Sequence, residues 1–207
     1  SCNPAMGGIA KGQIVREIDA LGGYSGIVTD LSTIQFRMLN LSKGPAMWSP
    51  RAQNDRMLFA AKWREWLEKT PNVDFYQDMV KEIIIKNNKA CGVITGLGHE
   101  IMAESVVVTS CNFLNGVINI GEKQFGGGRV AEKAATGITE QLVALGFESD
   151  RLKTGTPPRV DGRSLDYSKM EEQKGDEQIV GFSYLDIPRV KPENQRSCFI
   201  TYTNQTV

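Results

Sequence analysis

The chain has 207 residues, 41% of them hydrophobic, and its 24 basic side chains balance 24 acidic ones. A chain of this length can bury the core of one domain plus part of another. The balanced charge excludes a protein whose overall field attracts nucleic acid, so any contact with RNA must come from local basic patches. No apolar run is long enough to span a bilayer, and no signal peptide is recognisable.

The cysteines and the histidine indicate a protein without a structural metal. Four cysteines stand at positions 2, 91, 111 and 198, and this spacing matches neither a zinc site nor a small disulfide framework. His99 is the one histidine. We therefore expect no metal site, and we expect reduced thiols in a cytoplasmic protein.

Two amphipathic helices are expected in the first 70 residues. An apolar repeat at helical spacing, followed by two glycines, predicts a helix over residues 12–21. The pair Ser49-Pro50 is typical of an N-cap followed by proline at the first helical position, so we expect a second helix to begin there and end near Thr70. Its apolar residues share one face: Phe59, Trp63, Trp66 and Leu67. A stripe at this spacing favours packing in a core over stacking on bases.

From residue 73 onward the pattern changes to strands. Apolar runs predict three consecutive strands, over residues 80–85, 91–95 and 101–109. The pairs Asn87-Asn88 and Gly98-His99 fit the turns between them, because Asn and Gly tolerate a positive φ. The third run contains Val106-Val107-Val108, which is apolar on both faces, so we expect it to enter a buried parallel sheet.

The second half of the chain is less regular. The pattern predicts a helix over residues 131–145 that Gly146 ends, and the glycine run at 126–128 is typical of a simple loop because it lacks dinucleotide-binding spacing. Further on, the composition becomes polar. This change of composition indicates a domain boundary near Gly162.

The segment from Arg151 to Arg159 has the composition of an anion-binding loop. Lys153 and Arg159 stand on either side of a turn that Gly155 loosens and Pro157-Pro158 stiffens. Two cations placed in this way suit a phosphate or a carboxylate. A proline-rich surface loop with incidental charges is the alternative.

This loop and four other segments together resemble one protein family. The other segments are residues 1–12, 43–46, 51–56 and 200–204. In order and content they resemble the glucose-inhibited division protein A family over nearly the whole chain. The resemblance implies an α/β fold, namely a fragment of an FAD-binding, doubly wound domain like that of glutathione reductase. A three-stranded β-meander and part of an inserted α+β domain would complete it.

The resemblance also implies that the chain is an internal fragment. The family's Gly-rich dinucleotide turn precedes the motif with which this sequence opens, and the family continues past residue 207. Residues 1–162 would then be a partial FAD-binding domain, and residues 163–207 the truncated start of the inserted domain. Without the turn that holds the pyrophosphate, we expect the isolated chain not to retain FAD.

The activity that the resemblance implies is addition of a (carboxymethyl)aminomethyl group at C5 of the wobble uridine of transfer RNA. FAD and NADH would supply reducing power, and methylene-tetrahydrofolate the one-carbon unit. The implied partners are transfer RNA, a GTPase and a second copy of the chain. Cys2 matches the family's motif cysteine and would add to uridine C6 as a thiolate. Packing against the flavin is the alternative for Cys2.

Cofactor contacts carried over from the family fall on six positions: Asn3, Gly7, Gly8, Val80, Thr109 and Ala135. At Val80 an ordinary strand valine is the alternative. Ala135 stands where the family has a serine contact, which leaves at most a backbone contact. Cys111 replaces a glycine at a turn beside the cofactor, and its side chain would crowd that turn.

Phosphate contacts with RNA are implied at six basic positions: Arg51, Arg56, Arg129, Lys153, Arg159 and Arg163. Of these, Arg163 is better interpreted as solvated surface charge. Solvated surface charge is the alternative for each of them, and Arg51 and Arg56 could also serve within a helix or face the flavin. Two other functions stay open. One is a related folate- and FAD-dependent transfer RNA uridine methyltransferase, and the other is a non-catalytic binding fragment.

Overall fold

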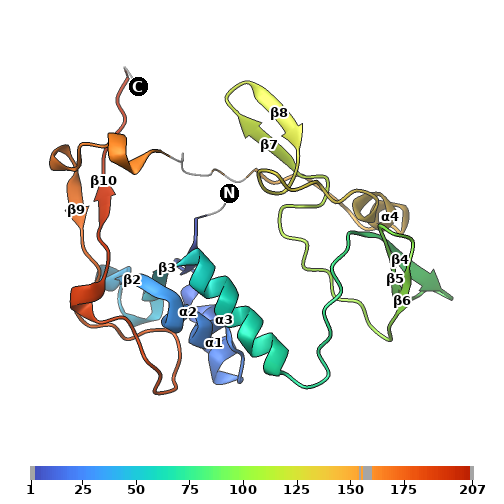
Figure 1. The fold of residues 1–207 in the computed structure, drawn as a ribbon, viewed down its shortest axis with the longest axis horizontal. Coiled ribbons are helices and arrows are strands. Elements are labelled where there is room, and N and C mark those ends of the chain that lie inside the picture. Colours follow the sequence, from blue (N-terminus) through green and yellow to red (C-terminus); the bar gives the residue numbers. More distant parts are fainter. Residues whose placement is uncertain (1–2, 154, 156–159, 206–207) are drawn as a thin grey trace. The chain divides into compact units, whose positions relative to one another are not determined.

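The computed structural model describes residues 3–153, 155 and 160–205 (Figure 1). These residues form two compact units. The outer unit consists of the described residues through Val73 together with those from Val160 onward, and the middle unit consists of residues 74–155. None of the helices in the described residues is long and apolar enough to cross a bilayer.

The outer unit contains a three-stranded antiparallel sheet in the order β1-β3-β2. Its strands are β1 (Ala5–Gly7), β2 (Thr33–Leu39) and β3 (Ser49–Asn54). Three helices accompany it: α1 (Gly12–Ala20), α2 (Ser25–Ser32) and α3 (Arg56–Lys69). Strands β9 (Glu171–Gln173) and β10 (Cys198–Ile200) pair as a separate antiparallel ribbon. Short 3₁₀ turns span Leu41–Lys43, Pro45–Met47, Gly162–Ser164, Tyr167–Lys169 and Pro192–Asn194.

The core of the outer unit lies against one face of this sheet. Val15, Phe36, Ala52 and Phe182 are buried together there, and the rings of Phe36 and Phe182 meet edge to face at 6.2 Å. Gly7 borders this core with a φ of +77°. A Cβ on Gly7 would lie 2.3 Å from the Pro50 carbonyl oxygen, so only glycine fits the approach of β1 to β3.

Helix α1 confirms the prediction for residues 12–21, but the helix start predicted at Ser49 is wrong. Ser49 and Pro50 belong to β3, and Pro50 lies just before the stretch of β3 that pairs with β1. Helix α3 begins after Asp55 instead. The Asp55 carboxylate accepts hydrogen bonds from the backbone N–H groups of the second and third helical residues, at 2.9 and 3.0 Å. Asp55, rather than Ser49, is therefore the N-cap of this helix.

The aromatic face of α3 packs against α2, as its spacing predicts. Trp66 stacks on Tyr24 with ring centroids 4.6 Å apart, and Phe59 meets Trp63 edge to face. The three aromatic side chains of α3 are half-buried, Tyr24 is exposed, and no residue of α3 is fully buried. The face is therefore an interhelical contact at the margin of the unit rather than its core.

The middle unit is built from two small antiparallel sheets and one helix. The first sheet contains β4 (Val80–Lys86), β5 (Lys89–Thr95) and β6 (Glu100–Met102). The second is the hairpin of β7 (Val117–Ile120) and β8 (Lys123–Gly126). The helix is α4 (Ile138–Ala144), and its Gln141 amide pairs with both backbone groups of Ile83 at 2.8 and 2.7 Å.

The turn predicted between the first two strands is confirmed, because Asn87 and Asn88 both have positive φ, at 52° and 60°. The third strand is shorter than predicted. It ends at Met102, and Val107 lies outside any strand with 85% of its surface exposed. No strand among the described residues flanks the valine run, so its backbone has no ladder to join.

The helix predicted over residues 131–145 is half as long. Ala131 has a φ of 68° and Gly137 of 104°, and neither value is compatible with a helix. Ala135 forms a parallel bridge with Leu114 instead. The predicted end is confirmed, since α4 stops just before Gly146, whose φ is 92°.

Candidate functional site

The sheet of the outer unit has a polar face on the side opposite its core. Because side chains alternate along a strand, the pair Phe36 and Ala52 faces the core, while the flanking cross-strand pairs face away. One of these pairs joins Gln35 to Gln53, and the other joins Arg37 to Arg51. Two arginines therefore stand directly opposite each other on neighbouring antiparallel strands.

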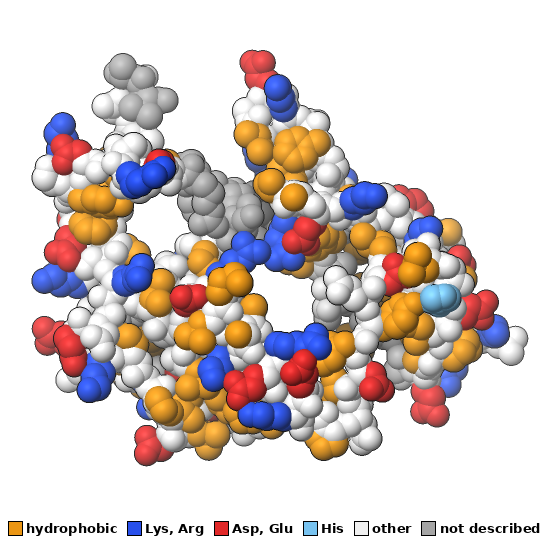
Figure 2. All heavy atoms as spheres, in the orientation of Figure 1, with side chains coloured by type: hydrophobic (Ala, Val, Ile, Leu, Met, Phe, Trp, Pro, Cys, Tyr) orange, Lys and Arg blue, Asp and Glu red, His pale blue; other side chains and the backbone are white. Residues whose placement is uncertain are grey.

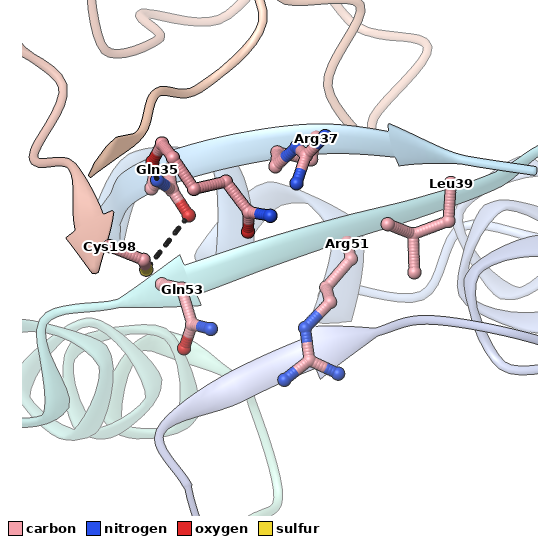
Figure 3. A pocket seen from close by; sticks show the side chains of 7 residues that line it. Gln35, Arg37, Leu39, Arg51, Gln53 and Cys198 are labelled. Carbon is pink, nitrogen blue, oxygen red and sulfur yellow. Dashed lines mark hydrogen bonds between the residues drawn. The ribbon is translucent and has the colours of Figure 1, made fainter. Parts of the chain in front are cut away.

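This polar face forms the floor of a cavity of about 340 Å³ (Figure 3). The lining residues are Gln35, Arg37, Leu39, Arg51, Gln53, Gln173 and Cys198. The β9–β10 ribbon closes one end of the cavity. Gln35 donates from Nε2 to the Gln173 carbonyl at 2.9 Å, and its Oε1 accepts from the Cys198 thiol at 3.2 Å.

The cavity is cationic, since no carboxylate is among its lining residues. In the described part of the chain neither Arg37 nor Arg51 forms an ion pair, and the buried Nε of Arg37 has no hydrogen-bond partner. Figure 2 shows acidic and basic side chains interspersed over the visible face of the molecule. The arginine pair is thus a local concentration of positive charge in a molecule of zero net charge, and it suits an anion.

Three of the predicted site residues meet beside this cavity. Gly7 pairs with Arg51 across β1 and β3, and a Cβ on Gly8 would lie 3.4 Å from Arg51 Nη1. Gly8 has a φ of +101° and anchors itself through its N–H to the Pro50 carbonyl at 2.9 Å. Figure 3 shows the Arg51 side chain extending from β3 across β1. The bare backbone at Gly8 leaves the Arg51 guanidinium uncovered on that side.

The segment that joins β9 to β10, residues 174–197, is here called the return segment. Its contacts hold the ribbon at the edge of β2. The backbone N–H groups of Phe36 and Met38 donate to the side chains of Gln195 and Asp176, at 2.7 and 2.6 Å. Asp30 of α2 is buried and accepts from the N–H groups of Phe182 and Ser183. Burial raises the pKa of the Asp30 carboxyl above its usual range, against the lowering by these bonds and by Arg189.

The other predicted residues of the outer unit are more peripheral. Asn3 is exposed, and its carbonyl accepts from the Ala5 N–H at 2.8 Å. Arg56 is exposed at the first position of α3. Cys2 and Arg159 lie outside the described residues, as does most of the loop in which Lys153 stands. Lys153 itself is exposed.

In the middle unit the predicted cofactor positions belong to different structural elements. Val80 opens β4 opposite Thr95 and is partly exposed, and Thr109 is exposed outside any strand. Ala135 donates its N–H to the Phe113 carbonyl, and its own carbonyl accepts from Asn115, both at 2.8 Å. Its backbone groups are thus already paired within the unit, and a cofactor contact would have to share them.

Arg129 and Cys111 also have structural roles in this unit. Arg129 forms an ion pair with Glu132 at 2.7 Å and lies over the Phe113 ring, so its charge is partly committed. Cys111 is exposed with a φ of 49°, the left-handed region that favours glycine. The turn therefore keeps a glycine-like shape although a cysteine occupies it.

Sequence reasoning missed Arg37 and the two glutamines of the pocket floor. A signal was present, because the polar Gln35 and Arg37 alternate with apolar residues from position 34 to position 38. This alternation would have indicated a strand with one polar face. The contributions of Gln173 and Cys198 had no such signal, since they come from more than a hundred residues further along the chain.

Comparison with known proteins decides the family. The model of the family described as glucose inhibited division protein A matches residues 1–207. The chain belongs to the glucose-inhibited division protein A family. Its mixed helix-and-strand fold superposes on the solved Aquifex aeolicus GidA with a TM-score of 0.86 at 44% identity, covering 96% of this chain and 34% of that one. This confirms the expected fold class, while the sheets in the described residues are small and antiparallel.

Family relatives among curated proteins are similar over the entire chain. Identity is 70% with a protein of Cytophaga hutchinsonii and 69% with one of Flavobacterium johnsoniae, in each case over 207 residues. Both relatives are named tRNA uridine 5-carboxymethylaminomethyl modification enzyme MnmG. The chain spans 33% of the length of each, so it corresponds to about a third of these family members.

Proposed function

We propose that this chain is part of an FAD-dependent enzyme that adds a (carboxymethyl)aminomethyl group at C5 of the wobble uridine of transfer RNA. The observation that carries the proposal is the match of the whole chain, at 70% identity, to a relative named for this modification. A cationic, amide-lined cavity beside the Gly7-Gly8 backbone adds a place where a polar small molecule can be held.

The residues present fit FAD at the outer unit. Gly8 needs glycine for its φ of +101°, and apart from Arg51 nothing lies within 4 Å of the position of a Cβ there. A flat ring can approach such a backbone closely, so Gly7, Gly8 and Asn3 would hold part of the cofactor. Taken by itself, the middle unit has exposed surface at the predicted positions Val80 and Thr109, whereas Ala135 offers only shared backbone groups. When bound, FAD would supply hydride chemistry.

Transfer RNA would contact exposed cations. Arg56 and Lys153 are exposed and suit phosphate contacts, which position RNA without reading its bases. Arg51 lines the cavity instead, which favours a small anion over a backbone phosphate. Arg159 stays a sequence-based expectation for the same role as Lys153.

The remaining parts of the proposal rest on the family resemblance. They are the Cys2 thiolate as the group that adds to uridine C6, NADH and methylene-tetrahydrofolate as co-substrates, a GTPase partner, and a homodimer. A reducing, cytoplasmic setting is proposed from the cysteine spacing.

Nucleoside analysis of transfer RNA tests the proposal. Disruption of the gene should abolish 5-carboxymethylaminomethyluridine, as measured by mass spectrometry of digested transfer RNA. The wild-type gene and a Cys91→Ser control should restore it, whereas Cys2→Ser should not. Unchanged levels after disruption would favour a non-catalytic protein, and loss of 5-methyluridine in its place would identify a uridine methyltransferase.

A further inference from the structure

We propose that the cavity over β2 and β3 binds the carboxylate of the small amino acid that donates the carboxymethylamino part of the modification. This inference rests on the proposed function. A carboxymethylamino group is the residue of glycine, whose amine forms the new bond while its carboxylate stays unreacted. An enzyme that installs this group needs a cationic site that recognises the carboxylate.

The opposed arginines supply that recognition. Cross-strand neighbours such as Arg37 and Arg51 have Cβ atoms about 4.5–5.5 Å apart, a distance at which like charges repel unless an anion lies between them. Guanidinium groups bind carboxylates through paired hydrogen bonds. Among the described residues neither arginine forms an ion pair, so the positive charge of both remains for a ligand.

The surroundings favour a small carboxylate over a phosphate of the RNA backbone. The β9–β10 ribbon covers one end of the cavity, and both arginines are only half-exposed, whereas phosphodiester contacts lie on open surface. Leu39 stands at the end of the cavity away from Cys198 (Figure 3) and offers no polar group. This end limits the side chain that an amino acid can carry.

The amide side chains suit the other end of the amino acid. Gln35 is fixed by its bonds to Gln173 and Cys198, so its amide cannot rotate freely. Gln53 extends from β3 on the same side as Arg51 (Figure 3). Its carbonyl oxygen can accept a hydrogen bond from an amine. The site would thus recognise the carboxylate of an amino acid through the arginines and its amine through Gln53.

Binding measurements on the intact protein test the site directly. Carbon-13-labelled glycine should bind, unlabelled acetate should displace it, and Arg51→Gln should weaken glycine binding at least tenfold. Arg64→Gln is the matched control and should leave binding unchanged, because Arg64 is an exposed arginine of α3 in the same unit and is paired with Glu68. Absence of glycine binding, equal binding by Arg51→Gln, or displacement by inorganic phosphate at lower concentration than acetate would each overturn the proposal.

A modification assay separates this inference from the proposed function. The intact protein with its partner would receive glycine or methylamine, which has the amine but no carboxylate, and the products would be resolved by mass spectrometry. Arg51→Gln should lower the glycine-to-methylamine product ratio at least tenfold, because only glycine carries the carboxylate. If Arg51→Gln leaves the glycine-to-methylamine product ratio unchanged while modification proceeds normally, the carboxylate site is refuted and the proposed function stands. Absence of every modified product from the wild type would refute the proposed function. The binding experiment with labelled glycine would then test the carboxylate site by itself.

Discussion

Arg37 and Arg51 lie directly opposite each other on β2 and β3, one position along from the core pair Phe36 and Ala52. Like charges opposed in this way destabilise a sheet. The repulsion occurs in the strands that also carry core residues, at a place where Gln173 and Cys198 of the ribbon line a cavity. Such a pair is typical of a binding site rather than of a surface selected for stability alone.

Relief of this repulsion should be measurable. We expect Arg51→Gln to raise the unfolding free energy by about 0.2–1 kcal/mol at low salt, because it removes one charge of the pair. In 1 M salt the gain should shrink, since the screening length falls to about 3 Å. Urea denaturation at two salt concentrations measures both. Arg64→Gln, which breaks an exposed ion pair, should instead be neutral or slightly destabilising. A loss of stability in Arg51→Gln at low salt would contradict the prediction.

Asp30 should be the side chain that holds the return segment in place. Asp30→Asn keeps the shape but replaces an acceptor oxygen by an amide that faces the N–H groups of Phe182 and Ser183. We expect a loss of about 1–3 kcal/mol of unfolding free energy at neutral pH, measured by urea denaturation. A neutral effect would mean that the segment is held by packing of Phe182 alone.

The same variant has a defined pH dependence. Because burial raises the pKa of Asp30 above 3.8, the folded protein binds more protons than the unfolded chain between 3.8 and the raised pKa. The wild-type advantage over Asp30→Asn should therefore narrow as the pH rises through this window. Asp161 gives the opposite sign, because its ion pair with Arg163 lowers its pKa, so its contribution is lost as the pH falls. Parallel stability curves for wild type and Asp30→Asn would refute the assigned shift.

Substitution of Gly7 and of Gly44 by alanine distinguishes the cost of backbone strain from the cost of a steric clash. Gly7 and Gly44 both have positive φ, +77° and +88°, but only at Gly7 would a Cβ meet other atoms. Gly44→Ala should cost about 1–3 kcal/mol, because a φ of +88° with a ψ of 162° is a backbone region that essentially only glycine adopts. Gly7→Ala should cost more, by about 1–3 kcal/mol, because Pro50 and the Phe182 ring must move. Thermal unfolding of both variants measures the difference, and equal losses would show that β1 shifts freely.

The turn at Cys111 should prefer glycine. Cys111→Gly keeps the left-handed conformation but removes its cost of about 1–2 kcal/mol for a residue with a Cβ. Glycine adds about 0.5–1 kcal/mol of conformational entropy to the unfolded chain, which offsets part of this gain. We expect a net gain of up to about 1 kcal/mol in unfolding free energy. Asn88→Gly is the control, since asparagine tolerates its φ of 60° and little should change. Destabilisation by Cys111→Gly would indicate that the cysteine side chain makes a stabilising contact.

The loop around Lys153 gives the test of RNA binding. Lys153→Glu and Arg159→Glu in the intact protein should weaken binding to all transfer RNAs alike and flatten its salt dependence, because phosphate contacts carry no sequence information. Arg163→Gln serves as the control, since Arg163 is exposed and already paired with Asp161. Filter binding at several salt concentrations measures the slopes. Intact RNA affinity with lowered FAD content would assign the loop to the cofactor instead.

Local signals in the sequence determined several elements of this protein. The apolar repeat and glycines specified α1 and its end, and the pair Asn87-Asn88 specified the turn between β4 and β5. Each of these features depends on residues close together in the chain, where side-chain spacing and backbone preference act without help from elsewhere. The ordered motifs were sufficient to predict the family, which the comparison confirms.

Tertiary structure decided the rest. Ser49-Pro50 reads as a helix start, but pairing with β2 makes it a strand, and Val106 to Val108 read as a buried strand but have no neighbour in the described residues. The cavity depends on bonds from Gln35 to Gln173 and Cys198, which lie 138 and 163 residues away. Contacts at such separations arise only when the whole chain packs, because each alone is too weak to outweigh the entropy of closing so long a loop. The sequence supplied the arginines, and the fold placed them opposite each other.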